Sequence, residues 1–296
     1  MSAVATTVLP AADAAPRQRA LPLGLMLLLP IVAVNTLGFL APVFDLLVMS
    51  LRKAEASGAM LSNALTLGNW AGLFEDGFYL KLLWNTVRVS LVVTLVTLVA
   101  SYPIALFVHR AHRSWRNLLL VLVIAPFLTS AVVRTYGWIA ILSDQGLLNT
   151  ALKALGVGAP LRLLYNEIGV VLGLVEVLMP YMILALMAGF GRLDACLEEA
   201  AMSLGASPFT VFRRVVVPLS LPGIALGSLL TFVLSVSSFV TPRLLGGGRV
   251  FLLATEIYDQ ALVTLNWPLA ATLSIVVLVL FSLALVLYAR AVRRLD

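Results

Sequence analysis

Long apolar runs alternate with short charged segments along most of the chain. Six runs reach the roughly 20 mostly apolar residues that a helix needs to cross a bilayer. They cover residues 21–49, 82–108, 117–142, 168–191, 219–242 and 268–289. The pattern therefore predicts an all-α integral membrane protein with six transmembrane helices.

The first apolar run has two interpretations. Arg17 and Arg19 precede it, as basic residues precede the apolar part of a secretory signal peptide. However, the run at residues 21–49 is much longer than the roughly 7–15 apolar residues of such a peptide. No small-x-small cleavage site follows it promptly, so we expect a retained helix.

Composition agrees with a membrane protein and excludes other classes. Of 296 residues, 61% are hydrophobic and 11% are charged, against roughly 25% charged in soluble domains. A soluble enzyme and a disordered protein are thereby excluded, and the single cysteine, Cys196, allows no internal disulfide. The net charge of +6 is attributed to basic cytoplasmic loops rather than to nucleic-acid binding.

Lysine and arginine predict the orientation, because cytoplasmic loops are enriched in them. With the N-terminus inside, the inner segments hold Arg17, Arg19, Arg110, Arg113, Arg116, Arg192, Arg213, Arg214, Arg290, Arg293 and Arg294. The outer segments, which are longer in total, hold Arg52, Lys53, Lys81, Lys153, Arg162, Arg243 and Arg249. This bias favours an N-in/C-in topology.

The spans and loops divide the chain into four stretches. Residues 1–20 are expected to form a mobile cytoplasmic tail, and residues 21–81 the first helix with an outer segment. Residues 82–290 form the transmembrane core, and residues 291–296 a cytoplasmic C-terminal tail. Within the core, residues 192–218 form the cytoplasmic segment whose chemistry is most informative.

Residues 192–218 are expected to begin with two short helices and a tight joint. An apolar stripe at helical spacing supports the first helix: Leu193, Leu197, Ala200, Ala201 and Leu204. Gly205 can end that helix in a left-handed conformation. Ser207 followed by Pro208 is an N-cap and first-turn pair, which starts the second helix.

The second short helix is expected to end near Arg213 and Arg214. Cations at that position suit the negative end of the helix dipole and the cytoplasmic face. Pro218 then precedes the fifth apolar run.

A spaced motif runs through the same segment. Glu199-Ala200-Ala201 is followed after three residues by Gly205, and after nine more by Val215-Val216-Val217-Pro218. This pattern resembles the EAA loop of ABC-importer permeases, in which Ile-x-Leu-Pro closes the motif. The resemblance implies a type I ABC importer permease fold with an ABC type-1 core at residues 82–290, and a coupling helix that docks on a cytoplasmic ATPase. The coupling-loop residues that it implies are Glu198, Glu199, Ala200, Ala201, Gly205, Ser207, Pro208, Arg213, Arg214 and Pro218.

Other motifs extend the resemblance over about residues 84–267. Arg134-Thr-Tyr-Gly-Trp138, Pro180-Tyr-Met-Ile-Leu, Phe239-Val-Thr-Pro and Asn266-Trp-Pro268 look like the spermidine/putrescine-type permease subunits. This resemblance implies import of a small organic solute, with a polyamine as the expected substrate. It implies as partners two ATPase subunits, a second homologous permease forming a heterodimer, and an extracytoplasmic solute-binding protein. The location would be the bacterial cytoplasmic (inner) membrane, where the chain is multi-pass and contacts the lipid bilayer. The chain itself would hold no cofactor, because ATP and Mg²⁺ would bind to the partner ATPases.

Charged residues within the apolar runs are candidates for the translocation pathway. Glu176 lies about 13 Å into the fourth run at 1.5 Å per residue, near the middle of the bilayer. It departs from the neutral residue usual in the resembling family. It can attract a protonated amine or serve as a hydrogen-bonded packing residue. The complete candidate set is Glu176, Arg134, Tyr136, Trp138, Tyr181 and Asp45.

The same positions have structural alternatives. Asp45 suits a side chain that reaches towards the membrane surface, and Arg134 a snorkelling or paired cation. His109 and His112 are spaced for a metal on a helix, but the surrounding arginines favour a basic inner loop and no metal site. Gly246-Gly-Gly248 lacks the Gly-Lys-Ser/Thr of a phosphate-binding loop and is expected to be an outer turn.

Two other function classes are alternatives to a permease without enzymatic activity. An intramembrane hydrolase needs a nucleophile with a base, or a ligand cluster, within the spans. No histidine lies within the core of a run, and Cys196 lies in the inner segment. An ATP-independent secondary transporter or channel remains the alternative, against which the motif spacing argues.

Overall fold

The computed structural model describes residues 20–54, 61–156 and 161–293. These divide into two compact units, residues 1–45 and 46–296, and each is described by itself. The expected inner cations Arg17, Arg19 and Arg294 lie outside the described residues, as do most of the two expected tails.

The first unit contains most of helix α1 (Ala20–Ser50), which agrees with the apolar run at residues 21–49. After it, an unexpected pair of short strands interrupts the helices. Strand β1 (Arg52–Ala54) pairs antiparallel with β2 (Leu61–Leu65), with Arg52 opposite Leu65. The amide of Asn69, in α2 (Gly68–Glu75), donates to the carbonyl oxygens of Ser50 and Arg52 at 2.8 Å each. A polar side chain thus satisfies backbone groups where the apolar run ends.

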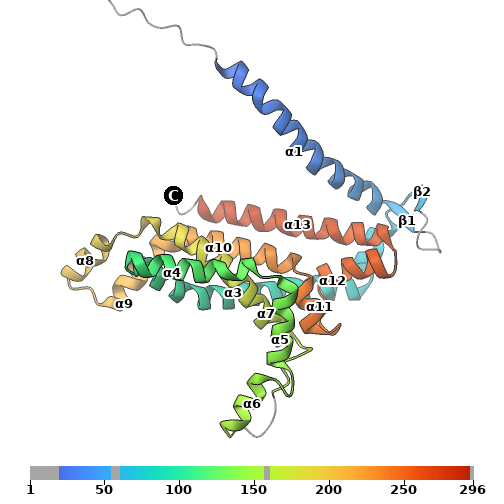
Figure 1. Cartoon of the computed structure of the whole chain (residues 1–296). Coiled ribbons are helices and arrows are strands. Elements are labelled where there is room, and N and C mark those ends of the chain that lie inside the picture. Colours follow the sequence, from blue (N-terminus) through green and yellow to red (C-terminus); the bar gives the residue numbers. More distant parts are fainter. Residues whose placement is uncertain (1–19, 55–60, 157–160, 294–296) are drawn as a thin grey trace, which may run out of the picture. The chain divides into compact units, whose positions relative to one another are not determined.

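Four long helices of the second unit match predicted runs. They are α3 (Gly77–Arg110), α7 (Glu167–Gly189), α10 (Val217–Ser237) and α13 (Trp267–Val292), shown in Figure 1. Helix α7 packs against both α3 and α10, and much of it is buried. Two glycines allow α7 and α10 to approach each other closely, because a Cβ on Gly189 of α7 would meet the Cα of Gly223 in α10.

The buried core lies between these helices. Val89 and Val93 of α3 and Leu174 and Leu178 of α7 form one fully buried cluster. A second cluster nearer the other ends of α3 and α7 contains Ala105, Met182, Leu186 and Phe190. Small hydroxyl residues also lie inside, among them Thr94, whose hydroxyl donates to its own helix at the Ser90 carbonyl oxygen at 2.7 Å.

The third predicted run is not one straight helix. It is divided into α4 (Arg113–Ile124) with a 3₁₀ turn at Ala125–Leu128, and α5 (Ala131–Leu142), after which a short helix α6 (Leu147–Ala154) follows. The two halves are bent by 96°. Thr129 and Ser130 have extended backbone at the break, and the Thr129 hydroxyl donates to the Pro126 carbonyl oxygen at 2.9 Å. Among the described helices, five are long and apolar enough to span a membrane, or six with this bent pair counted as one.

The fifth predicted run ends sooner than residue 242. Helix α10 ends at Ser237, and a separate helix α11 (Val240–Gly246) follows. Gly247 ends α11 in the left-handed region with φ +55°, so the predicted turn at Gly246–Gly248 is present. Helix α12 (Leu253–Tyr258) and a π turn (Asp259–Val263) then lead to α13.

Hydrogen bonds show which elements meet each end of α3. At its start, the Thr86 hydroxyl accepts from the Leu253 backbone N–H of α12 at 2.9 Å. At its end, Arg110 contacts helix α8 (Ala195–Ser203). Figure 1 accordingly shows α8 and α9 (Pro208–Val211) near one end of α3 and α12 near the other.

Candidate functional site

The segment predicted to couple to an ATPase begins with α8, and its start is capped by a carboxylate. The Asp194 side chain accepts from the Cys196 backbone N–H at 3.0 Å. This bond satisfies one of the free N–H groups of the first turn, and the charge suits the positive end of the helix dipole. Glu198 in the same turn adds a second negative charge.

The joint after α8 has the predicted geometry. Gly205 has φ +85°, the left-handed conformation that favours glycine. Its N–H donates to the Met202 carbonyl oxygen at 2.9 Å, and the Ala206 N–H donates to that of Ala201 at 3.1 Å. These two bonds form a Schellman motif, which closes the helix end without outside partners. The prediction that Gly205 ends the helix is confirmed.

The predicted start of the next helix is also confirmed. Ser207 is the N-cap of α9, its hydroxyl accepts from the Thr210 N–H at 3.3 Å, and Pro208 occupies the first turn. The predicted end of this helix near Arg213 and Arg214 is wrong.

Instead of ending, α9 continues through a π turn (Phe212–Val216) into α10. Arg213 and Arg214 therefore lie exposed within a continuous helix rather than at its end. Pro218 does not precede the span but lies in the first turn of α10. A proline removes one N–H from the ladder and crowds the carbonyl four residues earlier. The π turn at Phe212–Val216 lies directly before this first turn of α10.

The joint carries exposed apolar side chains as well as charges. Leu204 is 90% exposed and Phe209 is 72% exposed, on either side of Gly205. Met202 is also exposed. These exposed apolar side chains at the joint are available to a partner.

The motif residues themselves differ in their surroundings. Glu198 forms an ion pair with Arg110, from its Oε2 to the arginine Nη2 at 2.7 Å. Glu199 and Ala200 are exposed, and Ala201 is half-buried. The Glu199 carbonyl oxygen accepts from the Ser203 hydroxyl at 3.0 Å. The exposed Glu199 and Ala200 are thus available to a partner, whereas Glu198 is already paired.

The single cysteine lies in α8 beside the capping carboxylate. The Asp194 carboxylate, through its side-chain hydrogen bond to the thiol and its charge, raises the pKa of the exposed Cys196 thiol. A raised pKa leaves less of the reactive thiolate at neutral pH.

Three of the predicted pathway residues meet within the membrane part of the unit. The Arg134 Nε lies 3.5 Å from the Glu176 Oε2, and the Trp138 indole N–H donates to the same oxygen at 3.3 Å. Arg134 also donates from Nη1 to the Pro126 carbonyl oxygen at 3.1 Å. The arginine thus ties the bend after α4 to α7, and its positive charge compensates the negative charge of Glu176.

The other pathway candidates do not join this cluster. Tyr136 is exposed on α5, and Tyr181 packs its ring 4.7 Å from that of Phe127. Asp45 belongs to the other unit. His109 packs against the ring of Phe190 at 5.4 Å, and His112 precedes α4 as its N-cap residue.

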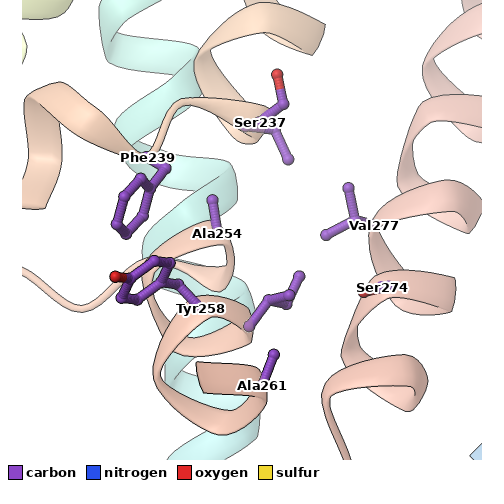
Figure 2. A pocket seen from close by; sticks show the side chains of 9 residues that line it. Ser237, Phe239, Ala254, Tyr258, Ala261, Ser274 and Val277 are labelled. Atoms are coloured by element: carbon purple, nitrogen blue, oxygen red, sulfur yellow. The ribbon is translucent and has the colours of Figure 1, made fainter. Parts of the chain in front are cut away.

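Sequence reasoning missed a cavity of about 380 Å³ beside the α10–α11 break. Figure 2 shows Phe239 and Tyr258 forming one wall, with Ser274 and Val277 on the facing helix. The two rings are stacked with centroids 4.3 Å apart. Arg243 lies 5.9 Å from the Tyr258 ring and pairs with Asp259 at 2.8 Å. The wall is therefore aromatic, and Arg243 supplies the cation beside it.

The sequence signals for this cavity were weak. Ser237 and Phe239 mark the end of a span, but only the fold brings Tyr258 and Ser274 to them. In the sequence, Phe239 is marked only by the motif Phe239-Val-Thr-Pro.

The family model of the binding-protein-dependent transport system inner membrane component matches residues 101–296. The spermidine/putrescine transport system permease protein PotB of Haemophilus influenzae is 39% identical, over 78% of this chain and 81% of its own length. The PotB of Escherichia coli is 38% identical, over 78% and 84%. An inner membrane ABC transporter permease protein of Escherichia coli, YdcU, is 30% identical, over 75% and 74%.

Solved structures share the fold at low sequence identity. A bacterial alginate ABC transporter in complex with an alginate-bound periplasmic protein has a TM-score of 0.74 at 18% identity, covering 94% of this chain and 96% of that one. The MetNI methionine ABC transporter has a TM-score of 0.54 at 16% identity, over 73% and 95%. These likenesses support the helical permease fold.

Proposed function

This chain belongs to the family of binding-protein-dependent transport system inner membrane components, and on that premise we propose that residues 192–218 couple it to an ATPase. The chain is a multi-pass inner membrane permease of an ABC importer. It forms the path for a solute, and ATP hydrolysis takes place on partner chains.

The observation that carries the coupling proposal is the joint between α8 and α9. Two short helices, fixed by a Schellman motif and a serine cap, project Leu204 and Phe209 outwards. The second helix continues into the span α10 without a break in the helical backbone. A displacement at the joint therefore reaches the membrane part directly, as a two-state rigid-body mechanism requires.

The test replaces Gly205 by valine in the reconstituted importer. A β-branched residue is strained at φ +85° and costs roughly 1–2 kcal/mol there. We expect uptake per ATP hydrolysed to fall about 5- to 30-fold, while the chain still inserts into the membrane. Solute uptake and phosphate release are measured on the same proteoliposomes.

The matched control is Gly191→Ala, because a Cβ there meets nothing within 4 Å and the φ angle is ordinary. Gly205→Asn is a second control, since asparagine tolerates the left-handed region. Normal coupled uptake by Gly205→Val would argue against the proposed coupling joint.

The partners fit the same scheme. Importer permeases of this family act with ATPase and extracytoplasmic binding-protein partners. We propose two ATPase subunits, which hold ATP and Mg²⁺, and a second, homologous permease that pairs with this chain as a heterodimer. The Leu204 and Phe209 side chains would enter an apolar groove on one ATPase, and Glu199 would lie at its rim. The larger number of basic residues in the predicted inner segments, among them Arg110, Arg113, Arg116 and Arg290, favours the N-in/C-in orientation.

The solute proposed is a polyamine. The support comes from relatives at 38–39% identity that are named spermidine/putrescine permeases. Glu176 no longer adds to it, because Arg134 compensates its charge within the chain. Other small organic cations, opines and amino-acid derivatives are the alternatives.

Calorimetric titration of the cognate extracytoplasmic binding protein tests the solute class. We expect heat of binding with spermidine or putrescine and none with a neutral sugar. Binding of only acidic solutes would overturn the polyamine assignment while leaving the permease assignment intact.

A further inference from the structure

Helix α8 is held to the membrane helices by very little besides the chain itself. Among the described residues, its main packing partners are α9 and the following π turn, both part of the same segment. A side-chain hydrogen bond joins α8 to the membrane helix α3, from Arg110 to Glu198. These two residues are 88 positions apart in the sequence.

Both charges of this pair are placed where their helices favour them. Arg110 is the last residue of α3, where the helix dipole favours a cation. Glu198 lies in the first turn of α8, where the helix dipole favours an anion. The Arg110 Nη2 and the Glu198 Oε2 lie 2.7 Å apart, the distance of a charge-assisted hydrogen bond.

A cavity of about 600 Å³ lies beside the pair, between α8 and the ends of α3 and α7. His109, Gly191, Asp194 and Met202 line it together with the pair. The ion pair crosses beside this space and is a direct side-chain link from α8 to the end of α3.

Helix α3 links the pair to the opposite end of the bundle. Its 34 residues span about 51 Å at 1.5 Å per residue. At the far end, Asn85 donates to the Phe251 carbonyl oxygen at 2.8 Å, and Thr86 accepts from Leu253. Leu253 begins α12, which also forms a wall of the Phe239–Tyr258 cavity.

We propose that the Arg110–Glu198 ion pair is a strut that transmits the movement of α8 to α3, in parallel with the covalent path through α9 and α10. Arg110 and Glu198 are thus positioning residues for coupling. The inference rests on the proposed function, because it assumes that an ATPase moves α8. The strut adds a second route, so that α3 and α10 move together when α8 moves.

The test uses the complete importer in proteoliposomes and measures solute imported per ATP hydrolysed. Arg110→Gln and Glu198→Gln are each expected to lower this ratio about two- to fivefold, the range of an ion pair that is partly exposed. The exchange variant, Arg110→Glu with Glu198→Arg, is expected to recover most of the ratio. Arg110→Lys keeps the charge and is expected to stay near the wild-type ratio.

The matched control is Arg113→Gln, which removes an exposed cation of the same inner region without breaking an ion pair of the described residues. An unchanged ratio in both single variants overturns the strut, as does an exchange variant no better than the single ones. If Arg110→Gln does not assemble, Glu198→Gln and Arg110→Lys still decide between these results. Failure of the proposed function is distinguishable, because Gly205→Val would then keep normal coupled uptake, whatever the Arg110 and Glu198 variants do.

Discussion

At the scale of single residues, the structure changes the meaning of the charges inside the membrane. Glu176 was predicted to attract a cationic solute or to act as a packing residue, and Arg134 to snorkel or pair. The structure pairs them, with Trp138 as a third partner. The sequence showed that both residues lie within apolar runs, but 42 positions separate them, and nothing in their local pattern indicates a contact.

The pairing of Glu176 with Arg134 predicts that substitutions of the two residues have non-additive effects on stability. Glu176→Gln leaves the Arg134 cation without its counter-charge, so we expect a loss of roughly 1–3 kcal/mol in the free energy of unfolding. The double variant with Arg134→Gln is expected to lose less than the sum of the single losses. Thermal unfolding in detergent measures the stability of the wild type, the two single variants and the double variant, which together form a double-mutant cycle. Strict additivity of the two single losses would contradict the pairing. The control is Glu75→Gln, on the exposed surface of α2.

The Cys196 thiol provides a chemical prediction. Asp194 raises its pKa, so the thiolate fraction at a given neutral pH is lower than for an ordinary cysteine. Asp194→Asn removes the charge but keeps an acceptor for the helix cap. We expect this variant to react several-fold faster with a maleimide at pH 7, and the midpoint of the pH–rate curve to move to lower pH. An unchanged or higher midpoint would exclude this effect of Asp194.

At the scale of elements, the predicted helices are mostly present, and their interruptions are the main differences. Gly205, Ser207 and Pro208 predicted the end of α8 and the start of α9, because each residue type has a specific backbone role at a helix end. The bend at Thr129 and Ser130 was not predicted, because both residues also occur within membrane helices. The π turn at Phe212–Val216 has no sequence signature apart from the proline that follows it.

The packing of α7 on α10 predicts a site that tolerates no added methyl group. Gly189→Ala places a Cβ against the backbone of Gly223, and backbone cannot rotate out of the way as a side chain can. We expect a destabilisation of roughly 1–3 kcal/mol, seen as a lower midpoint of thermal unfolding. Gly137→Ala in α5 meets nothing within 4 Å and is expected to unfold like the wild type. Equal midpoints for the two variants would contradict the close approach.

At the scale of the whole molecule, the apolar pattern predicted a multi-pass membrane protein, and its family confirms that class. The orientation stays a prediction, because the basic bias of the loops is its sole support. The partners and the solute likewise follow from resemblance, since no pattern of spans distinguishes one importer from another.

Cys196 makes the orientation testable, because it is the single cysteine of the chain. With an N-in/C-in topology, a membrane-impermeant maleimide should label Cys196 in inside-out vesicles and not in right-side-out ones. Membranes without the ATPase subunits avoid masking of α8. Arg249→Cys combined with Cys196→Ser should give the opposite result, since Arg249 is exposed on a predicted outer segment. The reverse pattern would overturn the topology.

The 96° bend has a consequence for how a cell makes this protein. Ser130 precedes α5 without a side-chain bond to its first N–H groups, and each such group facing lipid costs several kcal/mol. That part of the chain must therefore face protein or water once inserted. A copy synthesised without the other importer subunits would expose unpaired backbone N–H groups to lipid. Such a copy would become a substrate for membrane quality control. We expect its half-life in cells to lengthen when the other importer subunits are co-expressed.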